Sequence, residues 1–116
     1  MTENSYFKQL QDALRRGGYF RPVLVIDKIR LDANIDHVKA CLPAGRHLRL
    51  VDKSLAVLPL LSHLMQRLES RRIMSFHLPV ARTVLKTFPD ADILFGKPMP
   101  AEATYGLLGI KDRKWA

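Results

Sequence analysis

The stretch HLRLVDKSLAVLPLL, residues 47–61, decides how the fold is read. Its first five residues, HLRLV, predict a buried strand, and the leucines that follow recur at helical spacing. Lys53 stands between the two, where a strand gives way to a helix. A lysine at such a junction is either a solvated residue at the end of the strand or a residue with a chemical role.

Strand-like and helix-like segments alternate on both sides of this stretch. The predicted strands are PVLVID (22–27), HLRLV (47–51), IMSFH (73–77) and DILF (92–95). Helices are predicted between Ser5 and Gly17, between Asp27 and Pro43, over 55–69, between Pro79 and Pro89, and over 101–108. Strands and helices that alternate with short loops predict an α/β fold with a parallel sheet. Because the strands are mostly apolar, we expect both faces of the sheet to be covered by other elements. An open doubly wound sheet and part of a (β/α)8 TIM-type barrel both satisfy this pattern.

Composition and charge narrow the class of protein. The chain has 116 residues, of which 47% are hydrophobic and 26% charged, as expected for one globular domain with a core. No apolar run is long enough to span a membrane and the first ten residues do not resemble a secretory signal, so we expect a cytoplasmic protein. The net charge of +8 favours an anionic partner, but the scattered basic residues make nucleic-acid binding the weaker interpretation. The single cysteine, Cys41, is predicted to be a small buried hydrophobe on a helix.

Basic residues lie at the carboxyl ends of three of the predicted strands, namely Lys53, His77 and Lys97. In both candidate architectures functional groups gather at the carboxyl ends of the strands. Burial among apolar residues favours the neutral amine of a lysine, which can then form a Schiff base with a carbonyl. Enzymes that depend on pyridoxal phosphate (PLP) use such a lysine. Because most lysines at strand ends are solvated, position alone leaves both interpretations open.

A resemblance to a known family favours the chemical interpretation. Four stretches of this chain, in order over residues 6–105, resemble the N-terminal part of fold-type III PLP-dependent enzymes. They are YFKQLQDALRRGGYFRPVLVIDKIRLDANIDHV, LRLVDKS, RRIMSFHLP and FPDADILFGKPMP. The nearest branch is the group of D-threonine aldolase and D-serine dehydratase-like proteins, whose barrel is also called the alanine racemase N-terminal domain. The resemblance implies a lyase or isomerase of amino-acid metabolism that uses pyridoxal 5'-phosphate. It also implies a partial barrel over 21–116, preceded by an amphipathic helix within 1–20.

The same resemblance implies the site residues. In the family, the lysine that ends the first barrel strand carries PLP as a Schiff base, and here that lysine is Lys53. Arg49 matches an arginine four positions earlier, and strand alternation places it on the same face as Lys53, which would be the barrel interior. His77 is a candidate cofactor-binding residue, or else a strand-end histidine hydrogen-bonded to a loop. Lys97 is either a phosphate ligand or a solvated loop residue. No metal site is predicted, because the histidines lack metal-ligand spacing.

The chain departs from the family pattern in two respects. A complete (β/α)8 barrel takes about 250 residues, so the family's phosphate-binding loops would lie beyond Ala116. Asp52 stands where the family has a small apolar residue. Alternation along the strand turns its side chain outward, toward the covering helices, where we expect it to be buried without a partner.

Three interpretations of function follow. The first is the N-terminal segment of a PLP-dependent lyase or isomerase that acts on D-amino or β-hydroxy amino acids. The second is a catalytically inactive truncated fragment, or a small α/β binding module that associates through its sheet edge. The third is a basic nucleic-acid-binding domain. The expected partners are an amino-acid substrate and either a second copy of the chain or a missing C-terminal portion, with no membrane.

Overall fold

The computed structural model describes residues 3–54 and 56–109. Residue 55 of the predicted helix 55–69, and residues 110–116 at the end of the predicted barrel region, lie outside the described residues. The chain divides into two compact units, Met1–Leu31 and Asp32–Ala116. We describe each unit by itself.

The first unit is built on helix α1 (Glu3–Arg16) and on the start of helix α2 (Lys28–Cys41). As predicted, α1 ends at a glycine pair. Gly18 takes a positive φ of 77°, and the N–H of Tyr19 donates to the carbonyl oxygen of Leu14 at 3.0 Å. Asp27 caps α2, as expected, by accepting a hydrogen bond from the N–H of Arg30 at 3.1 Å.

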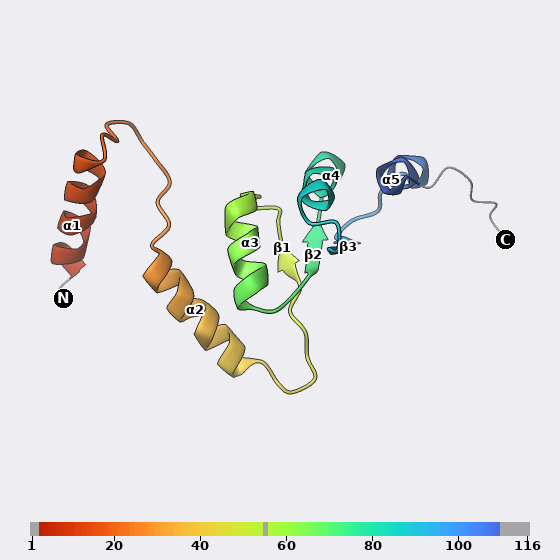
Figure 1. The fold of residues 1–116 in the computed structure, drawn as a ribbon, viewed down its shortest axis with the longest axis horizontal. Coiled ribbons are helices and arrows are strands. Elements are labelled where there is room, and N and C mark those ends of the chain that lie inside the picture. Colours follow the sequence, from red (N-terminus) through yellow and green to blue (C-terminus); the bar gives the residue numbers. More distant parts are fainter. Residues whose placement is uncertain (1–2, 55, 110–116) are drawn as a thin grey trace. The chain divides into compact units, whose positions relative to one another are not determined.

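The prediction of a strand over 22–27 is wrong. This segment forms the open connection between α1 and α2, drawn in orange in Figure 1, and has no regular structure. Its four apolar side chains from Val23 to Ile26 are 40–79% exposed. The physical reason is that a strand is stabilised by its neighbours, and the sheet of the described residues does not include this segment.

The second unit contains a parallel three-stranded sheet in the order β1-β2-β3 (Figure 1). Its elements are β1 (Leu50–Val51), α3 (Leu58–Arg67), β2 (Arg72–Ser75), α4 (Leu78–Thr87), β3 (Asp92–Phe95) and α5 (Ala101–Leu108). This arrangement confirms an α/β fold of alternating strands and helices with a parallel sheet. A closed barrel is not shown, and β1 is shorter than the predicted strand 47–51.

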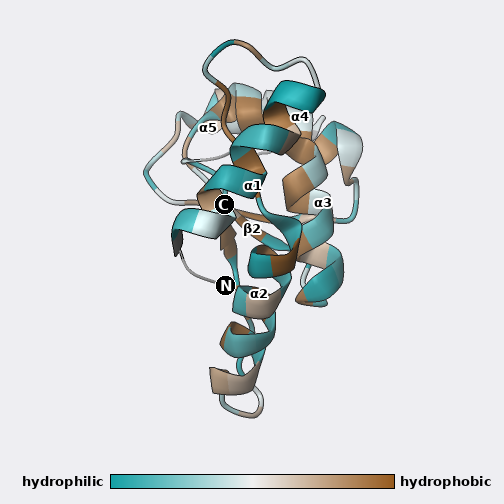
Figure 2. Cartoon of the chain, turned by 90° about the vertical axis from the view of Figure 1, so that its left-hand side faces the viewer, coloured by the Kyte–Doolittle hydropathy of each residue, from teal (hydrophilic) through white to brown (hydrophobic). Residues whose placement is uncertain are grey.

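Prolines set the starts of both helices that cover the sheet. Pro59 and Pro79 each lie in the first turn of their helix, where the missing N–H would have no partner within the helix. The helices then bury one side against the sheet. The core consists of the buried residues Leu61, Met65, Ile73 and Val84, with Leu50 and Ile93 packed against it. Figure 2 shows that α3 and α4 carry hydrophobic and hydrophilic residues side by side, as helices with one buried side do.

Within the described part of the second unit, no element covers the sheet face opposite α3 and α4, and we call it the open face. Strand alternation places Val51, Met74 and Leu94 there, and Val51 and Leu94 are 54% and 46% exposed. The prediction that every strand is covered on both faces is therefore not met in the second unit. An uncovered apolar sheet face marks a place where a ligand or another layer can bind.

The part of α2 within the second unit packs on α3 mainly through charged groups. Ile35 is the one buried residue of α2, whereas ionic contacts run along the interface. They join Asp36 to Arg67 at 2.5 Å and Lys39 to Glu69 at 3.0 Å, and beside them the ring of His63 is hydrogen-bonded to Asp32 at 2.5 Å. We call these three contacts the α2–α3 ladder.

Cys41, at the end of α2, is exposed, so the prediction that it is buried is wrong. Its Sγ lies 3.8 Å from Nε2 of His37 on the same helix. The cause is that α2 buries a single residue, which leaves the rest of its surface to solvent.

Candidate functional site

Lys53 lies at the carboxyl end of β1, where the sequence places it. The N–H of Asp52 still donates to the carbonyl oxygen of Met74 at 3.1 Å, so the β1–β2 pairing continues to the residue before Lys53. The Lys53 side chain is exposed, so the burial that would favour its neutral amine is not found, and its Nζ lies 5.0 Å from the centroid of the Phe76 ring. An ammonium group at this distance from an aromatic face is weakly held by the ring quadrupole.

The Phe76 ring lies over the backbone of Gly96. A Cβ at position 96 would overlap Cζ of Phe76, so the ring occupies space that any other side chain would need. The N–H of Gly96 donates to the carbonyl oxygen of Ser75 at 2.9 Å, which holds the end of β3 against β2. The carboxyl ends of the three strands thus bring Lys53, Phe76 and Gly96 together.

Arg49 lies at the other end of β1 and is bound to Asp92. Its guanidinium donates to the carbonyl oxygens of Ile73 at 3.2 Å and Asp92 at 2.9 Å, and pairs with the Asp92 carboxylate at 2.7 Å. The hydrogen bond from Arg49 holds the pKa of Asp92 below its ordinary value. Four residues of strand span about 13 Å, so Arg49 and Lys53 stand at opposite ends of the sheet.

His77 does not join Lys53. It precedes α4 with an extended backbone (φ −145°, ψ 119°), which continues the alternation of β2 and turns its side chain away from the side of Phe76. It lines a pocket of about 270 Å³ between the first turns of α3 and α4, together with Leu58, Val80 and Val84. Lys97, beyond β3, is exposed.

Two polar side chains lie in the layer between the sheet and the helices. Asp52 is 1% exposed and Ser75 is fully buried, and the register of β1 and β2 makes them neighbours. Oδ2 of Asp52 and Oγ of Ser75 have no hydrogen-bond partner among the described residues. The burial of Asp52 confirms the prediction from alternation. Ser75 was not singled out from the sequence, although its position two residues after Ile73 gives it the same face.

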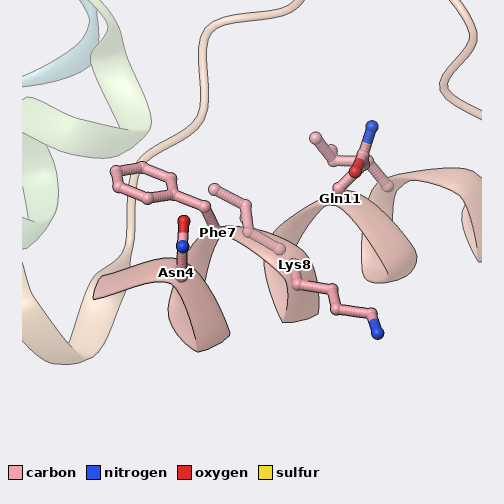
Figure 3. Close-up of a pocket in the computed structure, with 6 residues that line it drawn as sticks. Asn4, Phe7, Lys8 and Gln11 are labelled. Atoms are coloured by element: carbon pink, nitrogen blue, oxygen red, sulfur yellow. The ribbon is translucent and has the colours of Figure 1, made fainter. Parts of the chain in front are cut away.

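A further pocket, of about 690 Å³, follows one side of α1 in the first unit (Figure 3). Figure 3 shows Phe7, Lys8 and Gln11 along a single helix, so this hollow has walls from one element only. Lys53 lines neither this pocket nor the one beside His77. The candidate site at Lys53 is an exposed position on the open face of the sheet.

Other kinds of site find no support in the part of the chain that the structure describes. No group of three histidine, cysteine, aspartate or glutamate side chains there is placed to hold a metal ion. None of the helices described is long and apolar enough to cross a membrane. Comparison of the chain with protein-family models, with curated proteins and with solved structures finds no match.

Proposed function

We propose that this chain provides the first βα units of a PLP-dependent lyase or isomerase acting on D-amino or β-hydroxy amino acids, with Lys53 as the residue that binds the cofactor. One observation carries the proposal: Lys53 directly follows the last paired residue of β1, with its Nζ 5.0 Å from the centroid of the Phe76 ring. The carboxyl ends of parallel strands are where α/β enzymes gather their reacting groups. The resemblance of LRLVDKS to the family's lysine strand supports the same assignment.

The surroundings of Lys53 suit a planar pyridine ring. Phe76 offers an aromatic surface next to the amine. Because Gly96 has no side chain, the Phe76 ring can lie against the backbone at that position. Aromatic rings pack favourably at centroid distances of about 4.5–7 Å, in offset or edge-to-face arrangements. The open face leaves Lys53 accessible to a ligand. The amine end of a PLP site therefore fits the residues present.

Two residues of this chain would have different roles: Lys53 would bind the cofactor, and Arg49 would support the strand that carries Lys53. PLP, when bound, supplies an electron sink for negative charge at the substrate Cα. Nζ of Lys53 would hold the cofactor and would be placed to give or take a proton at that carbon. Arg49 ties β1 to β3 through Asp92, and by this contact it supports the strand that carries Lys53.

Borohydride reduction in the presence of PLP tests the assignment, because reduction fixes the cofactor to the lysine that holds it. Peptide mapping should find the label on Lys53. The Lys53→Ala variant should lose both the label and the visible absorbance of bound PLP. The Lys97→Ala variant, which removes an exposed lysine at the end of β3, should keep them. A label on Lys97, or an unchanged absorbance in Lys53→Ala, would overturn the proposal.

A second candidate function is a small α/β binding module without chemistry. The observation that favours it is the sheet itself: among the described strands β3 has no partner on its outer side, and Val51 and Leu94 expose apolar surface on the open face. Unpaired strand edges recruit other chains. Protein that associates through β3 but takes up no PLP would support this candidate over the first.

A further inference from the structure

Segment 22–27 of the first unit has the chemistry of a strand but no partner strand among the described residues. Its apolar side chains are exposed on both faces, with Leu24 79% exposed. No hydrogen bond within the described part of the chain engages the backbone of residues 22–26. Unpaired N–H and C=O groups between apolar side chains are the features through which an extended segment adds to another strand.

The segment is anchored at both ends. Before it, the N–H of Tyr19 donates to the carbonyl oxygen of Leu14 and closes the end of α1. After it, Asp27 caps α2 and accepts a hydrogen bond from the hydroxyl of Tyr6 at 2.9 Å, while the Arg30 guanidinium lies 3.6 Å from the centre of the Tyr6 ring. Anchored ends reduce the conformational entropy that pairing would cost.

We propose that segment 22–27 pairs antiparallel with the same segment of a second copy of this chain, about a two-fold axis at Leu24. In this register Leu24 faces its own equivalent, Val23 faces Val25, and Pro22 faces Ile26 of the other copy. A two-fold axis makes the contact self-complementary and limits the assembly to two chains. The inference is independent of the function proposed for Lys53.

Pro22 selects the hydrogen-bonding pattern of this register. Proline has no N–H to donate, so the pair of Pro22 with Ile26 has to be a non-hydrogen-bonded pair. Along antiparallel strands, hydrogen-bonded and non-hydrogen-bonded pairs alternate. The pairs of Val23 with Val25 therefore exchange N–H···O bonds, and every N–H of 23–25 that points at the partner finds an acceptor.

Charge complementarity favours a second copy of the chain over an unrelated strand. The apolar run is preceded by Arg21 and followed by Asp27, and these residues face each other twice in the proposed register. Oppositely charged residues directly across two strands attract, whereas like charges repel. The Asp27 side chain is 26% exposed, which leaves access for a second cation besides Arg30. Because two-stranded ribbons are marginal on their own, we expect a weak dimer that depends on concentration.

Disulfide trapping tests the two-fold axis at Leu24. In a Cys41→Ser background, Leu24→Cys should oxidise rapidly to a covalent dimer, because the Cα atoms of a non-hydrogen-bonded pair lie about 4.5 Å apart. Phe20→Cys is the matched control, since Phe20 is 85% exposed and, four residues before Leu24, would lie on the same face of a continued strand. In the register its two copies stand about 27 Å apart, so it should cross-link slowly. Equal rates for the two variants would overturn the proposal.

Charge reversal tests the register independently. Arg21→Glu sets two carboxylates against each other at both contacts with Asp27 and should raise the dimer dissociation constant about tenfold in sedimentation experiments. Arg82→Glu makes the same change of net charge at an exposed position on α4 and should leave this constant unaltered. An unaltered constant in Arg21→Glu would contradict the proposed contact. PLP labelling of Lys53 should be the same in both variants, so failure here does not bear on the proposed function.

Discussion

Asp52, like Ser75, is a buried polar side chain in the layer between the sheet and the helices. It is 1% exposed, and its Oδ2 has no hydrogen-bond partner among the described residues. Asp52→Val should therefore raise the free energy of unfolding by about 1–3 kcal/mol, because the substitution removes an unsatisfied buried polar group and supplies a β-branched apolar one. The midpoint of chemical denaturation should move to higher denaturant concentration with an unchanged slope.

Asp90→Val is the control for this substitution. Asp90 is exposed and pairs with Arg71 at 3.2 Å across the surface, so its replacement should change the free energy of unfolding by less than about 0.5 kcal/mol. If the Asp52→Val midpoint fell, Asp52 would have a partner or contact water, and its placement under the helices would be wrong.

The contact of Arg49 with Asp92 predicts a pH dependence. The hydrogen bond from Arg49 lowers the pKa of Asp92 below 3.8, so the folded protein binds this proton more weakly than the unfolded chain. The contribution to stability is full above the unfolded pKa and disappears as the pH falls through the folded pKa. In Arg49→Gln the loss of stability relative to the parent should be larger at neutral pH than in strong acid, where only the hydrogen bonds to the carbonyl oxygens of Ile73 and Asp92 still count. A pH-independent difference would show that the contact with the Asp92 carboxylate does not contribute.

At this scale the sequence predicts which way a side chain points better than what it touches. Alternation along 49–53 was enough to place Asp52 under the helices. The partner of Arg49 lies 43 residues further along the chain, and nothing local specifies the register that brings Asp92 beside it. His77 shows the same limit. Its position at a strand end was predicted, but its side chain turns toward the pocket between α3 and α4, because it is one residue past Phe76.

Helix α2 is held to α3 by the α2–α3 ladder, and this predicts salt sensitivity. Exposed ion pairs contribute at most about 1 kcal/mol each and are screened by salt. Raising the ionic strength from about 0.1 to about 1 M shortens the screening length from about 10 to about 3 Å. The amides of α2 should then exchange with solvent several-fold faster.

The amides of α4 are the internal control for this experiment. Helix α4 packs on the sheet through the buried residues Ala81 and Val84, and burial of apolar surface does not weaken with added salt. Its exchange rates should therefore stay the same or fall. If α2 and α4 responded equally, the α2–α3 ladder would not be what holds α2 in place.

Segments with strong end signals were predicted to within a few residues. DILF forms β3 over the predicted residues, and a Pro-Asp turn marks the start of this strand. Helix α5 also forms where it was expected, directly after a loop that contains two prolines. Segment 22–27 has equally strong strand composition but forms no strand. A helix satisfies its own backbone, whereas a strand needs a neighbour, and no local pattern reports whether one is present.

The second unit as a whole presents a sheet with two edges that are unpaired among the described residues. We expect the protein to self-associate through the β3 edge, in addition to any pairing of segment 22–27. Leu94→Lys places a charge beside this edge on the open face and should reduce the association measured by sedimentation at micromolar concentration. It should leave the cross-linking of Leu24→Cys unchanged. A single monomeric species with a sharp cooperative melt in the parent protein would contradict this prediction.

The order of the strands in the sheet is also their order in the chain. Each strand pairs with the next one along, β1 with β2 and β2 with β3, and the connecting helix covers the pair. Chains of low contact order close their contacts over short loops and fold fast. On the ribosome, β1, α3 and β2 can therefore assemble before β3 has been synthesised. Translation then supplies each new strand to the free edge of the strand before it, so the sheet grows on one side only, while the outer edge of β1 has no partner among the described residues.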